Sequence, residues 1–108
     1  MKDFRDIQEV RDYIDKIDYK ILKLFSDRNR CVKEIVNFKN DRTEIIAKER
    51  QKELLALRRK WAEELNLDPA LFENFYKRLI RSNIQKELRL FETNNNNLKT
   101  TKICRKDV

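Results

Sequence analysis

The chain has 108 residues, of which 42% are charged and 40% hydrophobic, with one proline and neither glycine nor histidine. Such a length allows one domain, and a composition rich in helix formers without glycine for hairpins or phosphate loops predicts an all-α fold. Because histidine is absent, Ser-His catalysis and the usual zinc sites are excluded. We expect no metal and no cofactor.

The sequence offers no membrane segment. No apolar run approaches the ~18 residues that a transmembrane helix needs, and the first ten residues, MKDFRDIQEV, are too polar for a signal peptide. Cys31 and Cys104 lie in such different settings that a disulfide framework is not expected. We therefore predict a cytoplasmic protein with reduced cysteines and no membrane partner.

The net charge of +7 raises the question of nucleic-acid binding. Residues 93–108 hold four of the 26 basic residues and one of the 19 acidic residues. The excess of positive charge in the rest of the chain is therefore small. The other charges alternate in sign, as in EVRDYIDKIDYK, which is typical of a solvated helix surface. We expect no nucleic-acid partner, and a nucleic-acid-binding module stays an alternative.

A long first helix is predicted from Ile7 to Lys39. No glycine or proline interrupts it, and apolar residues recur in steps of three and four, which defines an apolar seam: Ile7, Val10, Ile14, Ile17, Ile21, Leu24, Cys31, Ile35 and Phe38. A helix of about 50 Å cannot bury this seam against two shorter partners in so short a chain. The sequence therefore predicts an intertwined homodimer.

Arg28 occupies the one position of the seam that carries a charge. In one interpretation its guanidinium reaches out to solvent or sets the register of helix packing. In the other it is a buried cation that awaits an anion, because no acidic residue shares the seam and an unpaired buried charge costs several kcal/mol.

Two further helices follow. Residues 40–44 predict a break, and periodicity restarts for a second helix from Ala47 to about Leu65. Asp68 and Pro69 are a typical cap and first residue for a third helix, which is predicted to end near Glu92. Periodicity is then lost, so the domain is predicted to span residues 1–92, followed by a disordered polar tail over 93–108.

Each helix carries polar residues on the face that should be buried. They are Arg28 and Lys39 on the first helix, Arg50 and Gln51 on the second, and Asn83 and Glu87 on the third. Unpaired buried polar groups cost ~1–3 kcal/mol each, so several of them favour a polar cavity over repeated poor packing.

The spacing of the cations predicts what this cavity binds. On one helix, Arg28 and Lys39 would lie within ~20° of one face and ~16 Å apart, while Arg11 would lie ~25 Å from Arg28. Arg11 could therefore enter the site only from the partner chain of an antiparallel dimer. Four or five cations around one pocket predict a small dicarboxylate held by guanidinium groups.

Three stretches resemble the all-helical class of chorismate mutases: VRDYIDKIDYKILKLFSDRNRCVKEIVNFK, AKERQKELL and LDPALFENFYKRLIRSNIQKEL. The resemblance covers about Ile7 to Glu92. It implies three helices per chain, a dimer with two active sites, and the rearrangement of chorismate to prephenate without a covalent intermediate. Catalysis would come from holding a compact reactive conformer and stabilising negative charge as it develops.

The resemblance also implies roles for individual residues. Arg11 resembles the arginine donated across the dimer, and Arg28 the main carboxylate anchor. Lys39 resembles the lysine that donates to the ether oxygen of the substrate. Arg50 resembles the arginine of the second helix, and Ile84 a residue of the pocket wall.

Some positions depart from the typical mutase pattern. Ala47 stands where mutases have an aspartate for the ring hydroxyl, Gln51 replaces the following glutamate, and Asn83 replaces a small or aromatic residue. Glu87 replaces the glutamine of both bacterial branches, although a glutamate at this position also resembles the fungal mutases. It must be protonated to donate a hydrogen bond.

Three alternatives to the mutase remain open at this stage. Ala47, the spacing from Lys39 to Arg50 and the segment KWAEELNLD resemble the isochorismate-pyruvate lyase branch, which releases pyruvate and salicylate. A mutase acting on 4-amino-4-deoxychorismate is a second alternative, since the ring-substituent site is altered. A non-catalytic helical interaction module is the third.

Overall fold

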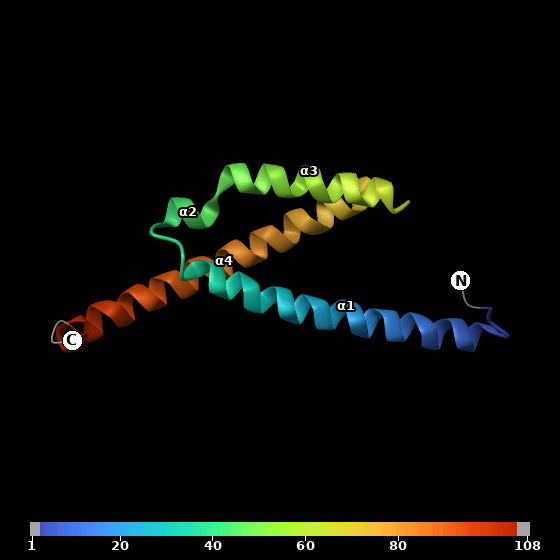
Figure 1. Cartoon of the computed structure of the whole chain (residues 1–108), viewed down its shortest axis with the longest axis horizontal. Helices are drawn as coiled ribbons and strands as arrows, with labels where there is room; N and C mark the ends of the chain where they lie inside the picture. Colours follow the sequence, from blue (N-terminus) through green and yellow to red (C-terminus); the bar gives the residue numbers. More distant parts are fainter. Residues whose placement is uncertain (1–2, 106–108) are drawn as a thin grey trace. The chain divides into compact units, whose positions relative to one another are not determined.

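The computed structural model describes the backbone of residues 3–105 and the side chains of residues 3–94. This part of the chain is helical and contains no strand, which confirms the predicted all-α class. Its elements are α1 (Ile7–Val36), α2 (Arg42–Ile46), α3 (Lys48–Glu64) and α4 (Pro69–Arg105), labelled in Figure 1. The chain divides into two units, Met1–Glu34 and Ile35–Val108, and each is described by itself.

Helix α1 begins where the sequence predicted. The Asp6 carboxylate accepts a hydrogen bond from the Glu9 N–H at 2.9 Å, which satisfies one of the free N–H groups of the first turn. The Arg5 Nε atom lies 2.9 Å from a carboxylate oxygen of Glu9. The acidic side chain of Glu9 in the first turn also favours this helix end, because it faces the positive end of the helix dipole.

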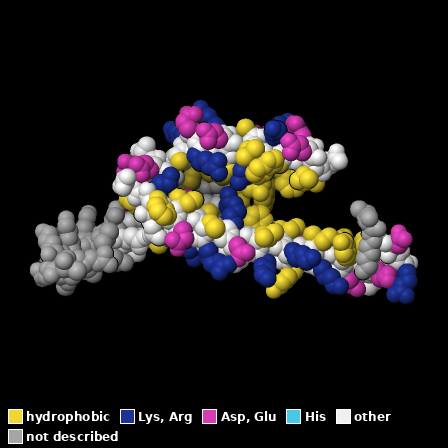
Figure 2. Space-filling model, viewed as in Figure 1, with side chains coloured by type: hydrophobic (Ala, Val, Ile, Leu, Met, Phe, Trp, Pro, Cys, Tyr) yellow, Lys and Arg dark blue, Asp and Glu magenta, His cyan; other side chains and the backbone are white. Residues whose placement is uncertain are grey.

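The apolar seam of α1 is largely exposed in the single chain. Ile7 and Leu24 keep 64% and 66% of their surface exposed, and even Ile17 near the middle keeps 41%. Figure 2 shows hydrophobic side chains following α1 beside Lys and Arg side chains. The first unit therefore leaves most of its apolar face unburied.

The predicted end of the first helix at Lys39 was wrong. Helix α1 ends at Val36, and the next backbone bonds are tighter, from Phe38 N–H to Ile35 O and from Lys39 N–H to Val36 O, at 2.9 and 3.2 Å. Phe38 is 80% exposed, so no packing holds the last seam position in a helix.

The short helix α2 was missed, because residues 40–44 were expected to form a break. Its N-cap is Asp41, whose side chain accepts a hydrogen bond from the Glu44 N–H at 2.8 Å. The Glu44 carboxylate in turn accepts from the Asn40 N–H at 2.6 Å. The signal was present in the sequence, since an aspartate followed three residues later by a glutamate is typical of a capping box.

Helix α3 is bounded at both ends by non-glycine residues with positive φ. Ala47 (φ 46°) separates α2 from α3, and Asn66 (φ 58°) follows the C-terminus of α3. After Asn66, the Leu67 N–H bonds to Ala62 O at 2.8 Å while the Asn66 N–H bonds to Glu63 O at 3.2 Å. This is the Schellman arrangement, with asparagine in the position that glycine usually takes.

Helix α4 starts as predicted and runs further than predicted. Asp68 accepts hydrogen bonds from the Ala70 and Leu71 N–H groups at 3.0 and 3.3 Å, and Pro69 is the first helical residue. The predicted helix end near Glu92 was wrong, because the backbone stays helical to Arg105. An asparagine costs less than ~0.7 kcal/mol in a helix, so a run of them need not end one. Residues 106–108 of the predicted tail lie outside the described residues, and the domain boundary after Glu92 stays a prediction.

The buried apolar side chains of the described residues all belong to the second unit. They are Val36, Ile45, Leu54, Ala62 and Ile80. Helix α3 packs along α4, and α2 also contacts α4. Figure 1 shows α3 and the first part of α4 running side by side in opposite directions. Helix α4 therefore contacts both α2 and α3.

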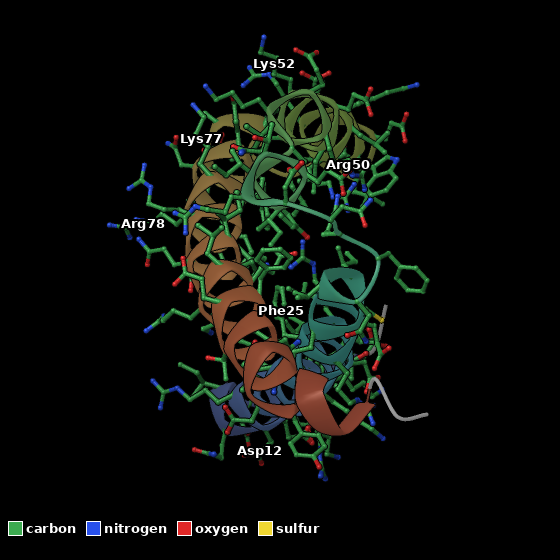
Figure 3. The ribbon with its side chains drawn as sticks, turned by 90° about the vertical axis from the view of Figure 1, so that its left-hand side faces the viewer. Asp12, Phe25, Arg50, Lys52, Lys77 and Arg78 are labelled. Atoms are coloured by element: carbon green, nitrogen blue, oxygen red, sulfur yellow. The ribbon has the colours of Figure 1, made fainter. Side chains whose placement is uncertain are left out.

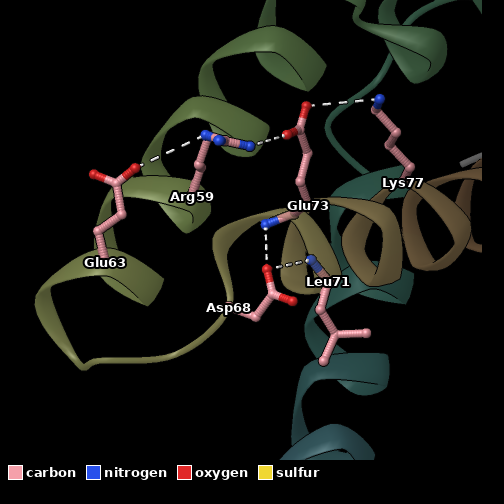
Figure 4. A network of polar contacts seen from close by, with 7 residues as sticks. Arg59, Glu63, Asp68, Leu71, Glu73 and Lys77 are labelled. Carbon is pink, nitrogen blue, oxygen red and sulfur yellow. Dashed lines mark hydrogen bonds and ion pairs between the residues drawn. The ribbon is translucent and has the colours of Figure 1, made fainter.

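A network of charges near the α3–α4 loop joins these two helices (Figure 4). Arg59 of α3 donates to Glu73 of α4 at 2.7 Å, and Lys77 Nζ lies 3.6 Å from the same carboxylate. The hydrogen bond from Arg59, with smaller contributions from the charges of Lys77 and Arg59, lowers the pKa of Glu73. A second link, between Arg42 and Glu92, joins α2 to α4.

Candidate functional site

Helix α4 carries a pair of buried polar residues one turn apart. Asn83 is 6% exposed and Glu87 is 8% exposed, and both lie on the face of α4 that also buries Ile80. They are the buried polar residues among the side chains that the structure describes. The prediction that the stripe of α4 becomes polar at these positions is confirmed, and half-buried Ile84 lies beside them in the sequence.

Lys39 belongs to the same unit but not to α1. It is half-buried, and it lies in the bend that follows Val36. The predicted geometry of Arg28 and Lys39 assumed one continuous helix, so its figures of ~20° and ~16 Å do not apply. The bend places Lys39 just before α2, in the unit that contains Asn83 and Glu87.

The junction of α2 and α3 holds three more candidates. Ala47, expected to begin a helix, instead adopts a left-handed conformation (φ 46°, ψ 60°) and is half-buried. Gln51 is also half-buried, and its Nε2 atom donates to the Ile46 carbonyl at 2.7 Å. Arg50 is exposed in the single chain, and Figure 3 shows it leaving α3 in a different direction from Lys52.

The remaining two candidates, Arg11 and Arg28, lie on α1 in the first unit. Arg28 is half-buried, and its Nη1 atom is fully buried without a hydrogen-bond partner among the described residues. An unsatisfied buried N–H group costs about 1–3 kcal/mol, which favours an acceptor from outside the described part of the chain. Arg11 is exposed. Since both lie in one helix, about 25 Å of helix rise separates them.

The structure thus places seven of the nine candidates in one unit: Lys39, Ala47, Arg50, Gln51, Asn83, Ile84 and Glu87. Sequence reasoning missed the hydrogen bond that links Gln51 to Ile46, because it took the second helix to be continuous from Ala47. No group of three metal-ligating side chains lies close enough together to hold a metal within the described part of the chain. None of the described helices is long and apolar enough to cross a membrane.

A helical scaffold that presents arginines, a lysine, an amide and a buried carboxyl without histidine is suited to binding an anion through fixed charges. Comparison with known protein families identifies the family to which this scaffold belongs. Residues 10–88 match the family described as chorismate mutase type II, and the chain belongs to this family.

Characterised relatives cover most of the chain. A chorismate mutase from Methanocaldococcus jannaschii is 38% identical over 96 residues, which is 86% of this chain and 96% of the relative. An isochorismate pyruvate lyase from Pseudomonas aeruginosa is 31% identical over 88 residues, 82% of this chain and 87% of the relative. A T-protein from Enterobacter agglomerans is 34% identical over 83 residues, which is 76% of this chain but 22% of that protein.

Proposed function

We propose that the chain is a chorismate mutase that converts chorismate to prephenate. The observation that carries the proposal is the buried pair Asn83 and Glu87 on α4, in the unit that also holds Lys39 and Arg50. Membership of the type II family and the 38% identical mutase support it. A Claisen rearrangement breaks one C–O bond and forms one C–C bond within a single molecule, so it needs neither a nucleophile nor a general base.

In this mechanism the cations bind the two carboxylates of the substrate. Arg28 and Arg11 are the carboxylate anchors, and the orphaned Nη1 atom of Arg28 supports this role, because a substrate oxygen would satisfy it. Arg50 adds a further positive charge. Holding both carboxylates fixes the flexible side chain of the substrate near the ring, which lowers the entropic part of the barrier.

Lys39 and Glu87 act on the ether oxygen, where negative charge grows as the C–O bond breaks. Lys39 donates from its ammonium group. Glu87 donates only when it is protonated, because an ionised carboxylate has no proton to give. Interactions that strengthen as this charge develops raise kcat, since they favour the transition state over the bound substrate.

The proposed active unit is a homodimer. Its support is the apolar seam of α1, on which Ile7, Ile14, Ile17, Ile21 and Leu24 are each at least 41% exposed in the single chain. Contiguous apolar surface of this extent marks an interaction site. In an antiparallel pair of α1 helices, Arg11 of each chain would complete the site that contains the Arg28 of the other.

Isochorismate pyruvate lyase is the second candidate. Ala47 supports it, because an alanine offers no carboxylate to a ring hydroxyl in the place where mutases are expected to have one. The 31% identical lyase supports it as well. The lyase would use the same cations, and its products would be salicylate and pyruvate.

One experiment separates the candidates. The purified chain is incubated with chorismate and, in a second reaction, with isochorismate, and the products are identified by chromatography and mass spectrometry. Prephenate from chorismate supports the mutase, and salicylate with pyruvate from isochorismate supports the lyase. Conversion of neither substrate would contradict both enzyme assignments.

A further inference from the structure

The side-chain amide of Gln51 is committed to the protein backbone. Its Nε2 atom donates to the Ile46 carbonyl at 2.7 Å, across a sequence separation of five residues, in a half-buried setting. A hydrogen bond of this length in partly buried surroundings fixes the rotamer of the glutamine. Gln51 therefore has a structural partner before any substrate is present.

The Ile46 carbonyl depends on this bond because the helix is interrupted beside it. In a continuous helix the Arg50 N–H would bond to Ile46 O, but α2 ends at Ile46 and α3 begins at Lys48. Between them Ala47 is left-handed, which costs a residue with a Cβ atom roughly 1–2 kcal/mol. The Gln51 amide thus replaces the missing backbone donor and stabilises a strained junction.

A carboxylate could not replace the amide at this position. An ionised glutamate offers acceptors only, and it would face the carbonyl oxygen of Ile46 with a second negative oxygen. Glutamine has the length to reach back over one turn and the N–H₂ group to donate. The junction therefore specifies glutamine by its hydrogen-bonding chemistry.

The junction determines where the first turn of α3 lies. On one side α2 packs on α4, and on the other α3 packs on α4, which carries Asn83 and Glu87. Arg50 lies in that first turn, beside Gln51 in the sequence. Moving the junction would move the Arg50 guanidinium relative to the buried pair on α4.

We propose that Gln51 is a positioning residue, which holds the left-handed junction at Ala47 so that Arg50 is aimed at the anionic substrate. This inference rests on the proposed function, since it assigns Gln51 an indirect role at the same site. It leads to an unexpected consequence. A glutamate at position 51, which resembles the typical mutase sequence more closely, lowers activity here because it breaks the bond to Ile46.

A double-mutant cycle tests the positioning role. We expect Gln51→Glu to lower kcat/KM about tenfold in the wild-type background, mainly through a higher KM, and by less than about twofold in the Arg50→Ala background. Gln85→Glu is the matched control, because Gln85 is exposed on α4 and the change adds the same charge. Equal losses in both backgrounds, or no loss in the wild type, would overturn the proposal.

A second measurement does not depend on catalysis. The Ala47 N–H bonds to Thr43 O at 2.9 Å, and the Gln51 N–H bonds to Ala47 O at 3.0 Å. We expect Gln51→Glu to speed hydrogen exchange at both amides about tenfold or more, while the Ile80 amide of α4 is unchanged. Unchanged exchange at Ala47 would overturn the proposal. If wild-type protein converts neither substrate while exchange responds as expected, the proposed function fails and the role of Gln51 at the junction stands.

Discussion

At the scale of single residues, the chain uses polar side chains in places where packing alone would select apolar ones. Asn83 and Glu87 interrupt an apolar stripe on α4, and both are buried. Arg28 keeps a buried nitrogen without a partner among the described residues. A buried donor without a partner reduces stability, so the unpaired Nη1 atom of Arg28 is explained best by a ligand that satisfies it.

Glu87 gives the first prediction. If a protonated Glu87 donates to the ether oxygen, activity of the wild-type protein rises as the pH falls below neutral, because a larger fraction of Glu87 carries a proton. Glu87→Gln supplies a permanent N–H₂ donor and is expected to flatten this profile. The measurement is kcat against pH for both proteins. A profile that the substitution leaves unchanged would remove Glu87 from the mechanism.

Glu73 gives a second prediction, on stability. The hydrogen bond from Arg59 lowers its pKa, so the folded state binds a proton less readily than the unfolded state. Its stabilising contribution is present above the ordinary glutamate pKa of ~4.3 and is lost as the pH falls through the lower folded value. The advantage of wild type over Glu73→Gln in denaturant unfolding should therefore shrink below about pH 4. Glu53→Gln, at an exposed glutamate of α3, is the control and should show no such convergence.

At the scale of the elements, helix ends are determined by capping groups, and the prediction succeeded where these were recognised. The Asp68 and Pro69 pair was recognised, and α4 begins there. The Asp41 and Glu44 pair was not, and α2 was missed. Loss of apolar periodicity after Glu92 predicts a helix end, yet periodicity reports which face is buried and not whether the backbone is helical.

The cap of α4 allows a third prediction. Asp68→Ala removes the acceptor for the Ala70 and Leu71 N–H groups and should lower the free energy of unfolding by about 1 kcal/mol. Asp68→Asn, which keeps an acceptor oxygen, should lose much less. Denaturant melts of the three proteins measure the difference. Equal losses for alanine and asparagine would show that the charge of Asp68, and not its hydrogen bonds, stabilises the helix start.

At the scale of the whole molecule, the exposed apolar seam of α1 is the main feature that a single chain leaves unexplained. The proposed antiparallel dimer would bury the seam and would bring Arg11 of one chain to Arg28 of the other. The candidates Arg11 and Arg28 share one helix about 25 Å apart, so they cannot both serve one site from one chain. One antiparallel dimer would therefore both bury the seam and complete the site.

Mixing two inactive variants tests this arrangement. Arg11→Ala and Arg28→Ala homodimers are each expected to be almost inactive. After unfolding and refolding together, half of the dimers are mixed, and each mixed dimer has one intact site. About a quarter of wild-type activity should return. No recovery, with mixed dimers confirmed by mass spectrometry, would show that Arg11 and Arg28 act within one chain.

The sequence by itself determined the all-α class, the start of α1, the cap of α4 and the polar character of α4 at Asn83 and Glu87. These depend on local rules, namely apolar periodicity, capping chemistry and the cost of burying polar groups, which act within one or two turns of a helix. The same rules indicated the polar candidates, whereas Ala47 and Ile84 are candidates only through the family resemblance, which also implied the individual roles.

Only the tertiary structure decided where the chain leaves the first helix and how α2 joins α3. The bend after Val36 takes Lys39 off the helix that carries Arg28, and the left-handed Ala47 lies where the second helix was predicted to begin. The junction at Ala47 depends on how α2 and α3 each pack on α4, which is a contact between residues far apart in the sequence. The Gln51 amide can donate to the Ile46 carbonyl because the helix is interrupted at Ala47. Apolar periodicity in the sequence does not predict such a bond.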